Sequence, residues 1–206
     1  MQATRKNISE TGVAPKGDNW QVCETGIDGC LELRCQQFRD VRGSFVKTFS
    51  RSSFAKLGLE TDFVESFYTV SEARVLRGMH FQLPPADHAK LVYCISGEIM
   101  DVALDLRADS STYGKCAVVA LSEGSQNSLY LPRGLAHGFY VLRAPAVVMY
   151  HVTSEHAPAL DAGVAWNSFG LEWPDQSPVL SQRDVGFAPF EDFVSPFRMK
   201  TVQEQL

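Results

Sequence analysis

The segment that decides the fold spans residues 75–107 and reads VLRGMHFQLPPADHAKLVYCISGEIMDVALDLR. Arg77, His80 and Lys90 lie along a predicted loop that leads into two apolar strands, at residues 90–96 and 99–106. Cationic and proton-accepting side chains beside strand ends indicate a polar site in the mouth of a β-barrel. A barrel of this size can hold one small ligand.

Side chains alternate in character along residues 100–106. Asp101, Ala103 and Asp105 fall on one face and the intervening aliphatic residues on the other, because successive side chains of a strand point to opposite faces. We therefore expect the aliphatic face to pack against a second sheet and the other face to be polar.

Strand signals recur at short intervals, with breaks rich in Gly, Ser, Asp or Pro between them. Further strands are expected at residues 27–33, 62–70, 116–121, 128–131, 138–142 and 147–152. A short helix is expected at residues 51–59, capped by Ser52 or Ser53 and ended by Gly58. The tail from Glu172 should form loops and short helical turns over the barrel. The pattern as a whole predicts an all-β protein.

The composition predicts one soluble domain. Residues 1–19 are polar without periodicity and are expected to be a flexible segment before a single domain at residues 20–206. A net charge of -5 gives no reason to expect a nucleic-acid or anionic-membrane partner. The chain lacks an apolar run long enough to cross a bilayer and lacks a signal peptide, so we expect it in the cytoplasm.

A metal site is not expected. Metal ligation by imidazole usually needs two or three converging histidines, but Gln82 stands where a second histidine would complete an HxH pair with His80. His88 follows Pro84 and Pro85 on what looks like an exposed loop. The sequence therefore predicts neither a metal nor a cofactor.

Several motifs together resemble one known family. They are LRGMHFQLPPADHAKLV, GEIMDVALDLR, LPRGLAHGFYVL, VVMYHVTSEHAP and LSQRD, and they cover most of residues 25–193. In this order and spacing they resemble the dTDP-4-dehydrorhamnose 3,5-epimerase family of deoxysugar biosynthesis. The resemblance implies a double-stranded β-helix, the jelly roll of the cupin type, with short peripheral helices. It also implies a homodimer that exchanges N-terminal strands, and the apolar strand at residues 27–33 would otherwise leave an unpaired edge.

The resemblance implies four catalytic residues. By motif match, His80 removes a proton next to a ketone, Asp184 orients and charges that imidazole, and Lys90 neutralises the enolate oxygen. Tyr150 matches the family's proton donor. The structural alternatives are that Asp184 only caps the turn before Val185 and that Tyr150 is an ordinary strand aromatic.

The resemblance also implies residues that bind a nucleotide-diphosphate 4-keto sugar. Arg42 and Arg77 would hold the diphosphate or sugar hydroxyls, because a guanidinium matches phosphate oxygens. His137 would donate a hydrogen bond near the sugar carbonyl, and Gln82 belongs to the same substrate-binding set.

Five substrate-binding positions depart from the family pattern. Lys47 stands where a Glu is typical, Glu65 and Phe67 stand where Gln and Asn are frequent, His156 replaces an aromatic residue, and Asp161 replaces a Glu. We expect these positions to affect which nucleotide and sugar bind.

The leading hypothesis is a cofactor-independent epimerase that inverts C3, C5 or both centres of a nucleotide-linked 4-keto-6-deoxy sugar. A single-centre epimerase or a 3,4-ketoisomerase would begin with the same proton abstraction. Two other classes stay open at this point: a non-catalytic sugar-nucleotide-binding barrel and a metal-dependent cupin oxygenase.

Overall fold

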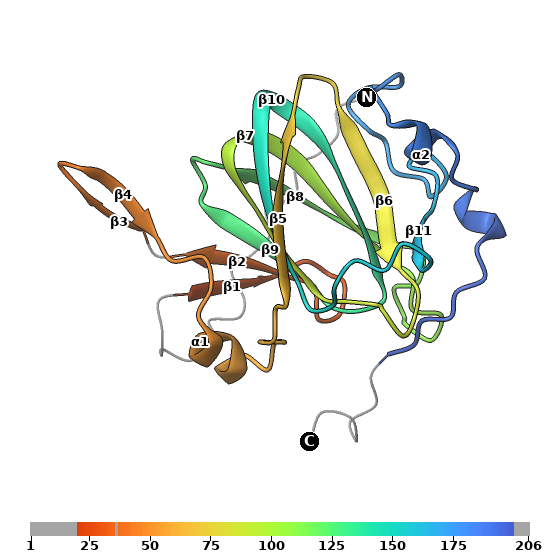
Figure 1. Cartoon of the computed structure of the whole chain (residues 1–206), viewed down its shortest axis with the longest axis horizontal. Coiled ribbons are helices and arrows are strands. Elements are labelled where there is room, and N and C mark those ends of the chain that lie inside the picture. Colours follow the sequence, from red (N-terminus) through yellow and green to blue (C-terminus); the bar gives the residue numbers. More distant parts are fainter. Residues whose placement is uncertain (1–19, 36, 200–206) are drawn as a thin grey trace.

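The computed structural model describes residues 20–35 and 37–199 (Figure 1). The segment at 1–19 that we expected to be flexible lies outside the described residues. In chain order the elements are β1 (Trp20–Glu24), β2 (Leu31–Cys35), β3 (Gln37–Asp40), β4 (Gly43–Val46), α1 (Arg51–Lys56), β5 (Glu65–Ser71), β6 (Leu76–Gln82), β7 (Lys90–Asp105), β8 (Cys116–Ser122), β9 (Asn127–Leu131), β10 (Leu135–Val152), β11 (Asp161–Gly163), α2 (Gln182–Val185) and the 3-10 turn η1 (Phe190–Asp192). The all-β prediction is confirmed.

Two long strands, β7 and β10, belong to both layers of the barrel. The first half of β7 pairs with β9 and with the second half of β10, which also pairs with β5. The second half of β7 pairs with β8 and with the first half of β10, which also pairs with β6. The strand order β1-β2-β9-β7-β10-β6-β11 thus folds over on itself, as expected for a jelly roll.

The predicted breaks inside these two strands were wrong. We expected strands at residues 90–96 and 99–106, and at 138–142 and 147–152, but each pair is one continuous strand. Gly97, with φ of +81°, and the register shifts between Val141 and Val147 mark a bend rather than a loop. The bend lets each strand turn from one sheet into the other.

The predicted loop that carries Arg77 and His80 is also a strand, β6. Gly78 allows β6 to approach β10 closely. A Cβ atom at Gly78 would lie 2.6 Å from the Cα of Gly138. His80 and His137 are therefore paired across neighbouring strands.

The alternation in residues 100–106 is present, but the expected environments of the two faces were wrong. Asp101, Ala103 and Asp105 are fully buried and face the barrel interior. The aliphatic face packs under the C-terminal tail, where Trp173 and Phe197 join its hydrophobic cluster. The polar residues therefore meet the second sheet, and the apolar residues meet the tail.

The helix and tail follow the predictions with two corrections: the helix ends at Lys56 rather than Leu59, and its N-cap differs. The N-cap of α1 is Ser50, without a side-chain cap bond, rather than Ser52 or Ser53. Gly58 follows the helix with φ of +70°, as expected of a helix stop. The tail contains α2 and η1, as predicted. Within residues 20–35 and 37–199, no helix has the length and apolar character needed to cross a membrane.

Candidate active site

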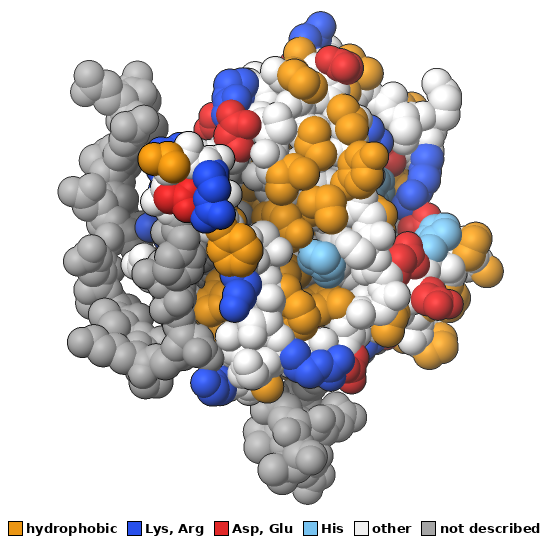
Figure 2. Space-filling model, turned by 60° about the vertical axis from the view of Figure 1, so that its left-hand side comes forward, with side chains coloured by type: hydrophobic (Ala, Val, Ile, Leu, Met, Phe, Trp, Pro, Cys, Tyr) orange, Lys and Arg blue, Asp and Glu red, His pale blue; other side chains and the backbone are white. Residues whose placement is uncertain are grey.

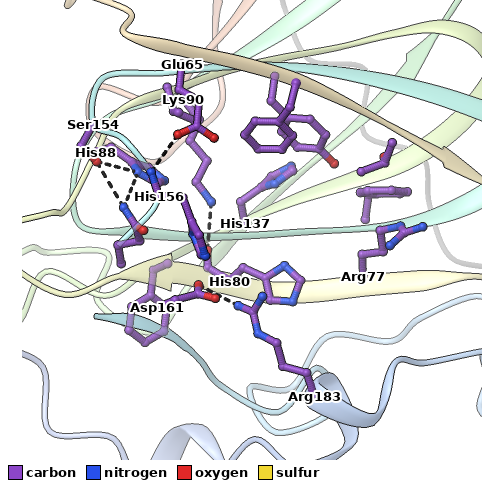
Figure 3. A pocket seen from close by; sticks show the side chains of 17 residues that line it. Glu65, Arg77, His80, His88, Lys90, His137, Ser154, His156, Asp161 and Arg183 are labelled. Carbon is purple, nitrogen blue, oxygen red and sulfur yellow. Dashed lines mark hydrogen bonds and ion pairs between the residues drawn. The ribbon is translucent and has the colours of Figure 1, made fainter. Parts of the chain in front are cut away.

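A cavity of about 340 Å³ opens in the barrel, lined by β5, β6, β7, β10, the segment after β10, β11 and α2 (Figure 3). Ten of the predicted site residues line it: Glu65, Phe67, Arg77, His80, Gln82, Lys90, His137, Tyr150, His156 and Asp161. Figure 3 shows Lys90, His80 and His137 in its middle, between Arg77 on one side and Ser154 and His88 on the other.

His80 and Asp184 form a tight pair at the cavity wall. Nε2 of His80 lies 2.7 Å from Oδ1 of Asp184, whose side chain is 3% exposed. Oδ2 of Asp184 accepts a hydrogen bond from the backbone N–H of Gly78 at 3.2 Å. Ser181, not Asp184, supplies the side-chain cap of α2. The capping alternative therefore does not explain Asp184, whose carboxylate is free to fix the tautomer of His80.

This arrangement leaves Nδ1 of His80 for a ligand, since no other described residue hydrogen-bonds to the ring. Burial lowers the pKa of His80, while the hydrogen bond to Asp184 opposes that shift. Burial alone would raise the pKa of Asp184, but its hydrogen bonds, that with His80 foremost, outweigh burial and hold this pKa below its usual range. Near neutral pH the pair is thus a neutral imidazole beside a carboxylate, which suits a base.

Lys90, the first residue of β7, places an ammonium group in the cavity. Its Nζ donates a hydrogen bond to the carbonyl oxygen of His80 at 3.1 Å, and the residue is 8% exposed. Burial lowers the pKa of Lys90 to about 8, against the opposing charges of Asp161 and Asp101. A partly desolvated ammonium interacts strongly with a developing oxyanion.

A second histidine–carboxylate pair lies deeper in the barrel. Nε2 of His137 is 2.7 Å from Oδ1 of Asp101, and both residues are buried. Burial raises the pKa of Asp101, which the contact with His137 opposes. Tyr150 lies beside this pair, with ring centroids 5.8 Å from His137. Burial, followed by the charge of Asp101, raises the pKa of Tyr150, so the phenol keeps its proton.

Sequence reasoning missed seven of the residues that line the cavity, among them His88, Ser154 and Arg183, and for His88 it was wrong. His88 is half-buried rather than exposed, and its Nδ1 lies 3.0 Å from Oγ of Ser154. Burial lowers the pKa of His88 to about 3. The spacing of two residues between His88 and Lys90 was the available signal, because it puts both on one face of an extended chain. Arg183 is ion-paired with Asp161 at 2.8 Å, and no motif or spacing in the sequence indicates that it lines the cavity.

Two predicted residues lie outside the cavity. Arg42 is on the hairpin formed by β3 and β4, where its guanidinium pairs with Asp40 at 2.5 Å and its side chain is 86% exposed. Lys47 follows this hairpin and is exposed. Figure 1 shows the hairpin projecting away from the barrel. Neither side chain meets the cavity of its own chain.

The polar groups of the cavity occur in pairs rather than in a ligand cluster. Across the described part of the chain, no three His, Cys, Asp or Glu side chains come together as a metal site would require. What the described groups can do is move protons: a base pair, an ammonium and a protonated phenol surround one small space.

These features define a class of protein, a cupin-type jelly roll whose barrel cavity holds groups suited to proton transfer. The family model for dTDP-4-dehydrorhamnose 3,5-epimerase matches residues 24–192, and the chain belongs to that family. The Shigella flexneri dTDP-4-dehydrorhamnose 3,5-epimerase is 37% identical over 174 residues, 83% of this chain and 96% of the relative. The resemblance seen in the sequence is thereby confirmed.

Solved structures agree with this assignment. A dTDP-6-deoxy-D-glucose-3,5-epimerase from Legionella pneumophila, in complex with dTDP-4-keto-L-rhamnose, has a TM-score of 0.84 at 29% identity, covering 88% of this chain and 100% of that one. ChmJ, a 3'-monoepimerase from Streptomyces bikiniensis, has a TM-score of 0.76 at 30% identity, covering 80% and 85%. The jelly-roll fold is shared by both.

Proposed function

We propose that this protein inverts C3, C5 or both centres of a dTDP-linked 4-keto-6-deoxy sugar. The observation that carries the proposal is the His80–Asp184 pair, whose free Nδ1 shares one cavity with the Lys90 ammonium and the Tyr150 phenol. The Legionella relative holds a dTDP-4-keto sugar, which supports the same class of substrate here.

In the proposed reaction, Nδ1 of His80 takes the proton from a carbon next to the C4 ketone. The electrons of the broken C–H bond pass to the ketone oxygen, and the Lys90 ammonium stabilises the resulting enolate. The Tyr150 phenol then returns a proton to the opposite face of that carbon, which inverts it. His137 adds a hydrogen-bond donor near the sugar carbonyl. The Asp184 carboxylate stabilises the positive charge that His80 gains with the proton.

The binding residues are proposed in the same way. Arg77, whose Nε donates to Oγ of Ser71 at 2.9 Å, would hold the diphosphate or sugar hydroxyls. Gln82 anchors the segment after β10 by accepting the backbone N–H of Ala157 at its Oε1. Glu65, Phe67 and the neighbouring His156 and Asp161 line the cavity and would tune the choice of nucleotide and sugar.

A single-centre epimerase is the second candidate. It is favoured by the likeness to ChmJ, a 3'-monoepimerase, together with Phe67, which departs from the family pattern and contacts the proposed donor Tyr150. Identification of the inverted centres separates this candidate from a 3,5-epimerase.

We also propose a homodimer, for a different reason than the sequence suggested. The strand predicted at residues 27–33 runs from Leu31 to Cys35 as β2 and pairs with both β1 and β9, so the sheet ends at β1 rather than at β2. Instead, the outer face of β5 and β7 exposes Tyr68, Val70 and Ile95 at 64%, 53% and 53%, and Figure 2 shows hydrophobic side chains gathered on this side of the molecule. A second copy covering this face would remove these apolar side chains from water.

The reaction is proposed to need no cofactor and to take place in the cytoplasm. The residues of the cavity supply a base, an acid and a cation, which are the groups that this proton transfer requires. Treatment with EDTA followed by metal analysis should leave a metal-poor protein with an unchanged rate.

The test of the function is NMR of the product formed from dTDP-4-keto-6-deoxyglucose in deuterated water. We expect an inverted sugar that carries deuterium at each inverted carbon. Recovery of substrate with neither inversion nor deuterium would overturn the proposal, and binding of the sugar without reaction would indicate a non-catalytic barrel.

A further inference from the structure

Tyr150 is held by an aromatic neighbour on the adjacent strand. Phe67 of β5 is its cross-strand partner in β10. The two rings are nearly parallel, with an interplanar angle of 14° and centroids 4.7 Å apart. On another side, the edge of Tyr150 meets His137 at an interplanar angle of 75°. Two ring contacts, together with the neighbouring side chain of Thr69, therefore set the position of the phenol.

The exposure of the two rings differs in an informative way. Tyr150 is 6% exposed, whereas Phe67 is 41% exposed and lines the cavity. A half-exposed ring adds less to the hydrophobic core than a fully buried one such as Phe54. Stability of the core thus gives little reason for an aromatic residue at this position, while the contact with Tyr150 gives a direct one.

The choice of phenylalanine also matters chemically. The family often carries Asn at this position, and an amide oxygen beside a phenol can accept the phenol proton. A phenyl ring cannot do so, and the side chain that does neighbour the hydroxyl is that of Thr69. Phe67 thus adds no acceptor that competes with the substrate for the proton of Tyr150, whose pKa burial raises.

We propose that Phe67 is a positioning residue for Tyr150, which aims the phenol at the carbon that receives the proton. Phe67 thereby sets how often an abstracted proton is replaced with inversion rather than returned from the original face. This inference rests on the proposed donor role of Tyr150. Displacement of a reacting group by about 1 Å can cost on the order of a hundredfold in rate, so the aim of the ring is decisive.

The test compares three substitutions, Phe67→Leu, Phe67→Asn and Phe67→Tyr, with Tyr150→Phe as reference. Each variant is incubated with dTDP-4-keto-6-deoxyglucose in deuterated water. NMR then gives two quantities, deuterium exchange next to the ketone and formation of inverted product. Their ratio does not depend on the fraction of folded enzyme, so partial misfolding does not obscure the result.

Phe67→Leu and Phe67→Asn should lower the ratio of inversion to exchange by about tenfold or more, whatever these substitutions do to substrate binding and to the rate of exchange itself. Phe67→Tyr, which keeps a stacking ring, should restore most of that ratio. The double variant Phe67→Leu with Tyr150→Phe should be no worse than Tyr150→Phe alone, because both act through the same phenol.

Two outcomes would overturn the proposal while leaving the function standing. One is a normal ratio in Phe67→Leu when Tyr150→Phe has lost inversion. The other is a ratio in Phe67→Tyr as low as in Phe67→Leu, which would show that a stacking ring at this position does not aim the phenol. If Tyr150→Phe itself keeps a normal ratio, the donor role fails, and that result is separate from any effect at Phe67.

Discussion

His80 and Lys90 should set the two limbs of the pH–rate profile. His80 must be neutral to act as a base, and burial lowers its pKa below the ordinary value of 6.5, so activity should fall only as the pH drops below about 6.5. Lys90 must be charged to stabilise the enolate, and its pKa of about 8 predicts loss of activity above that value. Exchange rates measured from pH 4.5 to about 9.5 should therefore give a bell-shaped curve.

The variant Lys90→Arg isolates the basic limb. A guanidinium keeps its charge throughout this range, so the fall above about pH 8 should disappear, although a lower rate is expected because the two groups differ in shape. If the basic limb persists in Lys90→Arg, that limb belongs to another group.

The variant Asp184→Asn tests the acid limb. Removal of the carboxylate that raises the pKa of His80 should move this limb to lower pH and leave residual activity.

At the scale of residues, motifs and spacing predicted a cavity residue where the chemical type of its side chain is what matters. His80, Lys90 and Tyr150 were predicted from their motifs and line one cavity. His88 was mistaken for a surface residue because two prolines precede it, and burial depends on how the segment folds back, which local sequence does not encode. Arg183 meets the cavity only because α2 packs beside β6, a contact between distant parts of the chain.

At the scale of elements, Gly97 is the position in the bend of β7 where substitution should destabilise the protein most. Its φ is +81°, and an added Cβ would lie 2.5 Å from the carbonyl oxygen of Arg143 and 2.6 Å from that of Pro145. Gly97→Ala should therefore lower the free energy of unfolding by about 3 kcal/mol, through backbone strain plus a clash between strands.

The matched control is Gly26→Ala. Gly26 has a similar φ of +88°, but no heavy atom lies within 4 Å of an added Cβ. It should show the backbone strain alone, on the order of 1 kcal/mol. Urea denaturation gives the free energy of unfolding of both variants. If the two substitutions lower it equally, the contact between β7 and β10 at this bend does not contribute to stability.

The same bend explains why strand number could not be predicted. Gly97 and Pro145 are typical of turns, and in most hairpins they would end a strand. Whether a bend joins two sheets or reverses the chain depends on the strands that pair on either side, here β5, β8 and β9. Periodicity correctly gave the residues that share a face, but it could not say that the aspartates of β7 face the interior.

At the scale of the whole molecule, the exposed apolar face predicts a dimer. Sedimentation at micromolar concentration should give the mass of two chains. Ile95→Asp, which places a carboxylate on this face, should weaken association by at least about a hundredfold, since a buried unpaired charge costs several kcal/mol. Val118→Asp, on β8 and also exposed, is the control and should stay dimeric. A monomeric wild-type protein would contradict the proposal.

The fold class and most of the site could be inferred from sequence because their signals are local: alternation, turn residues and motifs. The sequence could not predict which layer covers each face of β7. The aliphatic face packs against Trp173 and Phe197, which come from the far end of the chain. The position of Arg42 outside its own cavity likewise depends on the path of the β3–β4 hairpin rather than on its motif.

The most direct test of the central claim is deuterium exchange next to the ketone by His80→Ala. In the proposed reaction His80 is the base, and Asp184 is its orienting partner at 2.7 Å. Removal of the imidazole should lower exchange by at least about a thousandfold, while the sugar nucleotide still binds, because Arg77 and Lys90 remain. Exchange at the wild-type rate in His80→Ala would contradict the account and place the base elsewhere in the cavity.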